Sequence, residues 1–168
     1  MYLLSPYDRS WPRAFRRVAH ELQAVLGEPA STVHHVGSTA VATVSWSKPV
    51  LDVLVEVQDL AQLEGEGARR LRALGFEERA AYGISGRRYF VRPREADQPK
   101  VHLHGFRRGD PHVHRHLAFR DHLRRHPEDA ETYARLKRRL AGRHSHDRTA
   151  YQAGKGAFIR RIQARAGG

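Results

Sequence analysis

Apolar residues recur along this chain with two distinct periods, which predict its helices and strands. Between residues 5 and 26 the apolar positions lie three or four apart, as in Trp11, Phe15 and Val18. This spacing predicts a first helix, which Gly27 ends. The same periodicity predicts further helices at 59–74, at 111–126, from Pro127 onward and after a cap at Asp147.

Alternation of apolar and polar residues predicts the strands. In residues 50–57, four apolar side chains at odd-numbered positions form one face, and Asp52, Leu54 and Glu56 form the other. We expect this strand to be central, with its apolar face on helices. Further strands are predicted at 32–36, 77–80, 87–92 and 100–106, with turns at 37–39 and 83–86 and loops at 40–47 and 93–99.

The order of these elements predicts a single domain over residues 1–168 of the α/β (α+β) class. A mixed sheet would be packed by helices, with a helical part at the C-terminal end. No apolar run approaches the roughly 20 residues of a membrane span, and the first seven residues do not resemble a signal peptide. The chain has no cysteine, which excludes disulfides and thiolate metal sites. We therefore expect a cytoplasmic protein with no membrane partner.

The chain carries a net charge of +12, and arginine supplies most of it. Lysine occurs only at Lys48, Lys100, Lys137 and Lys155. Such a charge favours polyanionic partners: nucleic acid, nucleotides or phosphorylated small molecules. A solvated basic surface is the alternative, and the lack of a dense basic tail favours it.

An acid inside the apolar strand at 50–57 is the strongest sign of chemistry. Burying Asp52 is costly unless it is locally satisfied or functional. The preceding turn, Gly37, Ser38 and Thr39, has the small and hydroxyl residues that cradle phosphate. A carboxylate beside such a turn fits Mg²⁺-dependent phosphoryl or nucleotidyl transfer. The set of acids is incomplete, because Glu56 would lie about 7 Å further along the strand.

Two histidines share a strand face with Lys100. His102 and His104 could bind a metal with Asp52, bind phosphate as cations, or act as general acid and base. Simple hydrogen bonding inside a cleft is the alternative. The histidines at 112–116 and 144–146 are expected on the surface, because helical positions two apart do not share a face.

Two cationic positions could serve phosphate. One of Arg87 and Arg88 should face the cleft, where a guanidinium binds phosphate with two hydrogen bonds. Lys155 lies in the apolar stripe of the last helix and either extends to the surface or points into a cavity. Tyr151 lies one turn away, which favours the cavity.

Several segments, in order along nearly the whole chain, resemble the GrpB family. They are HVGST at 35–39, KPVLDVLV at 48–55, GRRYF at 86–90, HLH at 102–104, FRDHLR at 119–124, HPE at 126–128 and YARLK at 133–137, followed by Tyr151, Lys155 and Phe158. The resemblance implies the fold of the nucleotidyltransferase superfamily. The sequence departs from the expected pattern in two places: Ala42 and Thr43 stand where a Pro-Gly pair is usual in the family, and Leu54 replaces the second acid of the superfamily.

The residue chemistry, supported by the resemblance, leads to a first hypothesis: a nucleotidyltransferase-like enzyme that binds a nucleoside triphosphate with Mg²⁺ and transfers to an unknown acceptor. The phosphates would lie at Gly37, Ser38 and Thr39, and Asp52 would hold Mg²⁺, with Glu56 or His104 as further ligands. Either His102 or His104 would complete the metal site or move a proton. The phosphate charge would be neutralised by Lys48, Arg88 and Lys155, with Tyr151 beside them.

Two other functions stay open. One is a catalytically degenerate module that binds a nucleotide, a CoA-like molecule or RNA, as the missing acid at Leu54 favours. The other is a hydrolase that uses Mn²⁺ or Zn²⁺ on Asp52, His102 and His104.

Overall fold

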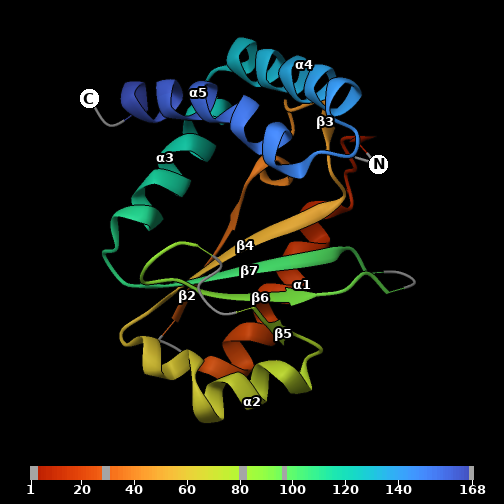
Figure 1. Cartoon of the computed structure of the whole chain (residues 1–168). Coiled ribbons are helices and arrows are strands. Elements are labelled where there is room, and N and C mark those ends of the chain that lie inside the picture. The colour runs from red at the N-terminus through yellow and green to blue at the C-terminus, as the bar shows by residue number, and fades with distance from the viewer. Residues whose placement is uncertain (1–3, 28–30, 80–82, 96–97, 167–168) are drawn as a thin grey trace.

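A five-stranded mixed sheet lies at the centre of the structure (Figure 1). The structure is a computed structural model that describes residues 4–27, 31–79, 83–95 and 98–166. β4 and β7 are parallel, and the other neighbouring strands are antiparallel. The α/β class with a mixed sheet is confirmed. Across the sheet the strands are β2 (Ser31–Val36), β4 (Val50–Val57), β7 (Lys100–Arg107), β6 (Arg88–Arg92) and β5 (Glu77–Glu78).

One face of β4 forms the main core, as its alternation predicts. The four apolar side chains at its odd-numbered positions are fully buried. They pack with Val18 and Leu22 of α1 (Trp11–Leu26) and with Leu71 of α2 (Gly65–Ala73). Burying each such side chain contributes about 1.5–3 kcal/mol, so this face anchors the sheet. The opposite face of β4 is thereby directed toward the C-terminal helices (Figure 1).

Three helices follow the sheet: α3 (Pro111–Arg125), α4 (Pro127–Arg143) and α5 (Arg148–Ala166). They pack on one another around a second apolar cluster, which Val41 and Val44 join from the segment after β2. The predicted helical C-terminal part is therefore confirmed, and it closes over one face of the sheet (Figure 1).

Local signals in the sequence place the starts of these helices. The Asp110 carboxylate accepts a hydrogen bond from the backbone N–H of His112 at 2.8 Å, which caps α3. The predicted cap of α5 is confirmed, because Asp147 accepts one from the backbone N–H of Ala150 at 2.9 Å. Such caps satisfy backbone donors that a helix leaves unpaired.

The predicted helix at 59–74 is wrong in its continuity. It divides into a short 3-10 helix η2 (Leu60–Leu63) and α2, which begins at Gly65. Gly65 has a φ of 48°, a conformation that suits glycine and interrupts a right-handed helix. Asp59 and Gln62 form a capping box that starts η2 as a separate turn.

Two other predicted segments differ in detail. The loop expected at 40–47 contains a two-residue strand, β3 (Trp46–Ser47), which pairs with β1 (Ser5–Pro6). This pairing depends on a partner far away in sequence. Ala80, the end of one predicted strand, lies outside the described residues. In the described part of the chain, no helix is long and apolar enough to cross a membrane.

A buried ion pair between β6 and α1 makes a testable contribution to stability. Arg92 is nearly buried, and its Nη1 lies 2.7 Å from Oε2 of Glu21, while its Nε and Nη2 have no hydrogen-bond partner within the described residues. We expect Glu21→Ala to lower the free energy of unfolding by about 2–4 kcal/mol, because it leaves a buried guanidinium unpaired. Urea denaturation measures this change.

A double variant and a surface variant control for that result. Adding Arg92→Met to Glu21→Ala should restore most of the loss, since the unpaired charge is removed. Glu66→Ala, which breaks exposed pairs with Arg69 and Arg70, should lower the stability far less than Glu21→Ala does. Equal losses for the two glutamate variants would contradict this account.

Candidate functional site

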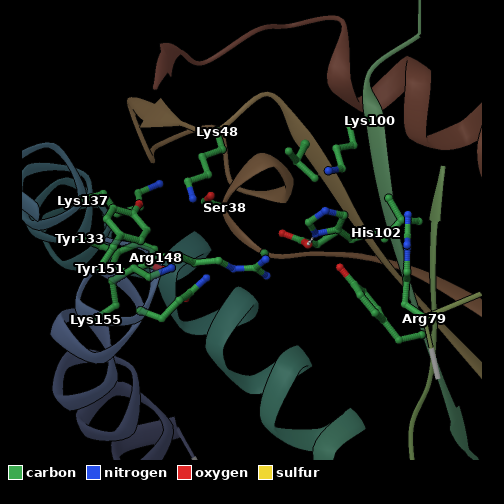
Figure 2. A pocket seen from close by; sticks show the side chains of 16 residues that line it. Ser38, Lys48, Arg79, Lys100, His102, Tyr133, Lys137, Arg148, Tyr151 and Lys155 are labelled. Atoms are coloured by element: carbon green, nitrogen blue, oxygen red, sulfur yellow. Dashed lines mark ion pairs between the residues drawn. The ribbon is translucent and has the colours of Figure 1, made fainter. Parts of the chain in front are cut away.

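A cleft lies between the even-numbered face of β4 and the C-terminal helices α4 and α5. Its main lobe has a volume of about 580 Å³. A side lobe of about 330 Å³ adjoins it toward α3. Figure 2 shows side chains from the sheet and from the helices pointing into this space. The two lobes are adjacent and share the lining residues Gly37, Asp52, Tyr89, His102, Tyr133, Arg148, Gln152 and Lys155.

The turn after β2 is built against Asp52. Gly37 has a φ of 70°, and a Cβ there would lie 2.5 Å from Oδ2 of Asp52. The position therefore requires glycine both for its backbone and for space. Ser38 lines the main lobe beside it, as predicted for a phosphate-binding turn.

Thr39 has a different place from the one predicted. Its side chain is buried, and its hydroxyl donates a hydrogen bond to the carbonyl oxygen of Val50 at 3.2 Å. The same hydroxyl lies 3.0 Å from Nε2 of His35, whose pKa burial lowers to about 4. Thr39 does not line the cleft, so its side chain supports the turn rather than a ligand.

The parallel pairing of β4 with β7 brings two histidines to Asp52. Asp52 is paired in register with His102, and its Oδ1 lies 3.5 Å from Nδ1 of His102 and 3.5 Å from Nε2 of His104. Burial alone would raise the pKa of the Asp52 carboxyl. Its hydrogen bonds and charge interactions with the two histidines outweigh burial and hold that pKa well below its usual range. Asp52 is therefore a carboxylate at neutral pH.

The side chain of Arg87, and not that of Arg88, faces the cleft. Arg88 donates hydrogen bonds to Oε1 of Glu64 on the other side of β6, so its predicted role with phosphate is wrong. Arg87 is buried, lines the side lobe and donates to Nδ1 of His104 at 3.4 Å. Because arginine only donates, this contact leaves the proton of a neutral His104 on Nε2, toward Asp52.

The arrangement of acids does not match a two-metal centre. Leu54 is fully buried in an apolar cluster with Val36, Phe106 and Val113, where the second acid would stand. Glu56 bonds to Nε2 of His34 at 2.7 Å and lines neither lobe, so it does not join Asp52 as predicted. Among the described residues, no group of three or more His, Asp or Glu side chains is placed to hold a metal ion.

The main lobe is lined by every lysine of the chain. They come from four different segments of the fold, and Figure 2 shows them around one space: Lys48, Lys100, Lys137 and Lys155. The ammonium groups of Lys48 and Lys155 lie 4.4 and 4.6 Å from the centre of the Tyr151 ring. Lys155 and Tyr151 thus take the places that their helical stripe predicts.

Burial and repulsion between neighbouring cations lower the pKa values of Lys48, Lys137 and Lys155. Lys137 is only 3% exposed, and burial followed by the charges of Lys155 and Lys48 lowers its pKa to about 7. Burial lowers the pKa of Lys48 and of Lys155 to about 8, with Arg148 adding to both effects. The Nζ of Lys137 also donates to the Ser47 hydroxyl at 3.1 Å. A bound anion would raise all three pKa values.

The site predicted from the sequence leaves out Lys137 and selects Arg88 instead of Arg87, although the sequence pattern indicates both cleft residues. Lys137 lies in the apolar stripe of α4, as Lys155 does in α5, so the same argument applies to it. Arg87 lies two residues before Tyr89 and therefore on its side of the strand. The expectation that His116 is on the surface is also wrong: it lines the side lobe, and burial lowers its pKa to about 4.

Sequence relatives decide the family. Residues 2–165 match the family described as GrpB protein. The chain belongs to the GrpB family. The UPF0157 protein YqkA of Bacillus subtilis is 33% identical over 160 residues, which are 95% of this chain and 46% of that protein. This GrpB chain therefore spans less than half the length of that relative.

Solved structures show the same fold. A crystal structure of the conserved protein GrpB from Enterococcus faecalis matches with a TM-score of 0.85 and 31% identity, covering 98% of this chain and 96% of that one. The Cid1 poly(U) polymerase with MgGTP bound matches with a TM-score of 0.59 and 13% identity, covering 82% of this chain and 44% of its own. At that identity the second likeness shows the fold alone, and the fold of this GrpB chain is nucleotidyltransferase-like.

Removing one buried lysine should stabilise the protein. We expect Lys137→Met to raise the free energy of unfolding at pH 7 by about 1–3 kcal/mol, because a partly charged buried group becomes apolar while Ser47 loses a partner. The pKa of Lys137 is lower in the folded state than in the unfolded state. The destabilisation caused by burying its charged form is therefore complete below about pH 7. It disappears as the pH approaches the ordinary lysine pKa of 10.5.

Denaturation curves at several pH values test this. The stability difference between Lys137→Met and the unaltered protein should shrink from pH 7 to pH 10. The exposed neighbour Arg139, changed to methionine, should show no such trend. A constant difference across this range would contradict the lowered pKa.

Proposed function

We propose that the cleft binds a nucleotide or a related ligand with a polyphosphate group. The observation that carries the proposal is the convergence of all four lysines on the main lobe, beside the turn at Gly37 and Ser38. Compact ammonium groups and a glycine turn are suited to phosphate oxygens. Only one carboxylate, that of Asp52, lines this lobe among the described residues, so the space attracts anions.

The side lobe is suited to the rest of such a ligand. Phe119 and Ile159 supply apolar surface there, and Gln152 and Gln163 supply amides that can both donate and accept hydrogen bonds. A planar base needs this combination of flat apolar contact and edge-on hydrogen bonds. We therefore place the phosphates in the main lobe and the base or another non-phosphate group in the side lobe.

Binding without transfer is the first candidate function, and nucleotidyl transfer is the second. Leu54, buried among apolar residues, favours a binding module over two-metal catalysis. The fold and the placement of Asp52 against Gly37 favour transfer. The third function considered, a metal hydrolase on Asp52, His102 and His104, lacks support from the donor geometry.

A charge placed inside the cleft tests the proposal. Isothermal titration calorimetry with ATP, GTP, CTP and UTP, each with Mg²⁺, should detect binding of at least one nucleotide. Gln152→Glu should weaken that binding about 5–10-fold, because the new carboxylate repels phosphate at short range. Ala153→Glu adds the same charge at the next position of α5, which is exposed and does not line the cleft, and should change the affinity less than twofold.

Two results would decide against the proposal. Binding of none of the four nucleotides would overturn it, and so would equal effects of the two glutamate variants. Pyrophosphate release in the same samples, where water is the acceptor of the nucleotidyl group, bears on the candidate functions: release that Asp52→Asn abolishes supports transfer.

A further inference from the structure

The chemistry around Asp52 favours cations of the protein over metal ions. Asp52 is the only carboxylate that lines either lobe among the described residues. Its Oδ1 already faces two imidazoles at 3.5 Å. Mg²⁺ needs oxygen ligands in near-octahedral geometry, and Zn²⁺ needs three or four converging donors. The donor set therefore lacks what a pair of divalent ions requires.

Cationic side chains line the same lobe as Asp52. The main lobe is lined by six cationic side chains: Lys48, Arg79, Lys100, Lys137, Arg148 and Lys155. Even with Arg79 paired to Glu77, the cationic groups outnumber Asp52. A divalent cation placed among them would be repelled by each ammonium group. These cationic side chains can themselves neutralise the charge of a phosphate group, as metal ions do in other sites.

Two of the lysines, Lys137 and Lys155, are held in place by contacts with neutral side chains. Lys137 is anchored by Ser47 at one wall, and Lys155 is held over Tyr151 at another. Within the described part of the chain, neither Lys137 nor Lys155 forms an ion pair with a carboxylate. Bringing these charges together costs free energy in the empty cleft, and a polyanion would offset that cost.

The choice of lysine at these positions is informative. Of the 30 Lys and Arg residues, only four are lysine, and all four line the main lobe. Lysine presents a compact charge that can lose its proton when buried, whereas arginine stays charged. A cluster of lysines can therefore relieve its own repulsion when the cleft is empty and recover full charge when an anion enters.

We infer that Lys48, Lys100, Lys137 and Lys155, here called the lysine cluster, bind a chain of three or more phosphates directly and without a divalent metal. The inference rests on the proposed function and gives its ligand class: a linear polyphosphate, either inorganic or the triphosphate of a nucleotide. It departs from the Mg²⁺ that the family resemblance implies. Asp52 then repels the ligand slightly and orients the histidines, instead of bridging to it through a metal.

Calorimetry with inorganic tripolyphosphate in excess EDTA tests the inference. We expect binding to persist in EDTA and to weaken when excess Mg²⁺ replaces EDTA, because Mg²⁺ neutralises the ligand. Lys155→Met and Lys137→Met should each weaken binding about 10-fold or more, as for the loss of a charged hydrogen bond. Arg139→Met removes one exposed charge from α4 and should have less than a twofold effect. Thermal unfolding of each variant verifies that it is folded.

Asp52→Asn changes the affinity for tripolyphosphate in opposite directions, depending on whether the lysines or a metal ion on Asp52 hold the ligand. It should strengthen tripolyphosphate binding in EDTA, because it removes the negative charge from the cleft; a ligand held through a metal on Asp52 would bind more weakly. Binding that requires Mg²⁺ and is lost in EDTA would overturn the inference but leave the proposed function intact. Binding of neither tripolyphosphate nor any nucleotide, with or without Mg²⁺, would overturn both.

Discussion

The parallel pairing of β4 with β7 is the constraint on which the site depends. It aligns Asp52 with His102 and places Leu54 level with His104. Parallel neighbours need a crossover connection, and η2, α2 and the β5–β6 hairpin supply it. The apolar face of the pair is buried under α1 and α2, so its polar face has to meet the C-terminal helices (Figure 1). A cleft with polar side chains on one wall follows from this division.

The buried ammonium group of Lys137 in the cleft lowers the stability of the fold. Lys137 is almost completely buried on α4, and its ammonium group contacts the Ser47 hydroxyl and the Tyr133 ring, both neutral. Tyr133 is itself buried, and burial raises the pKa of its hydroxyl, which keeps that ring neutral. A fold that needed only stability would place an apolar side chain at position 137. Under the proposed function, a bound anion would neutralise this charge.

The periodicity of the sequence predicts most of the fold and only part of the site. The faces of β4 and β7 and the position of Lys155 follow from periods of two and 3.6, which depend on local geometry. Arg88 lies on the side of β6 opposite to the one predicted, because the alternation has to be counted from Tyr89. Glu56 lies on the predicted face of β4 but bonds to His34 and lines neither lobe, since one face of a strand extends beyond one site. The β1–β3 pairing depends on contacts between distant segments, which local patterns do not contain.

Lysine-selective NMR is the most direct test of the central claim, because the chain has only four lysines. With ¹³C-labelled lysine in the unaltered protein, the side-chain signal of Lys137 should titrate near pH 7, and those of Lys48 and Lys155 near pH 8. Added tripolyphosphate should shift all four lysine signals with one dissociation constant and raise these three titration midpoints. Titration of these three signals near the ordinary value of 10.5, with no response to tripolyphosphate, would contradict the account.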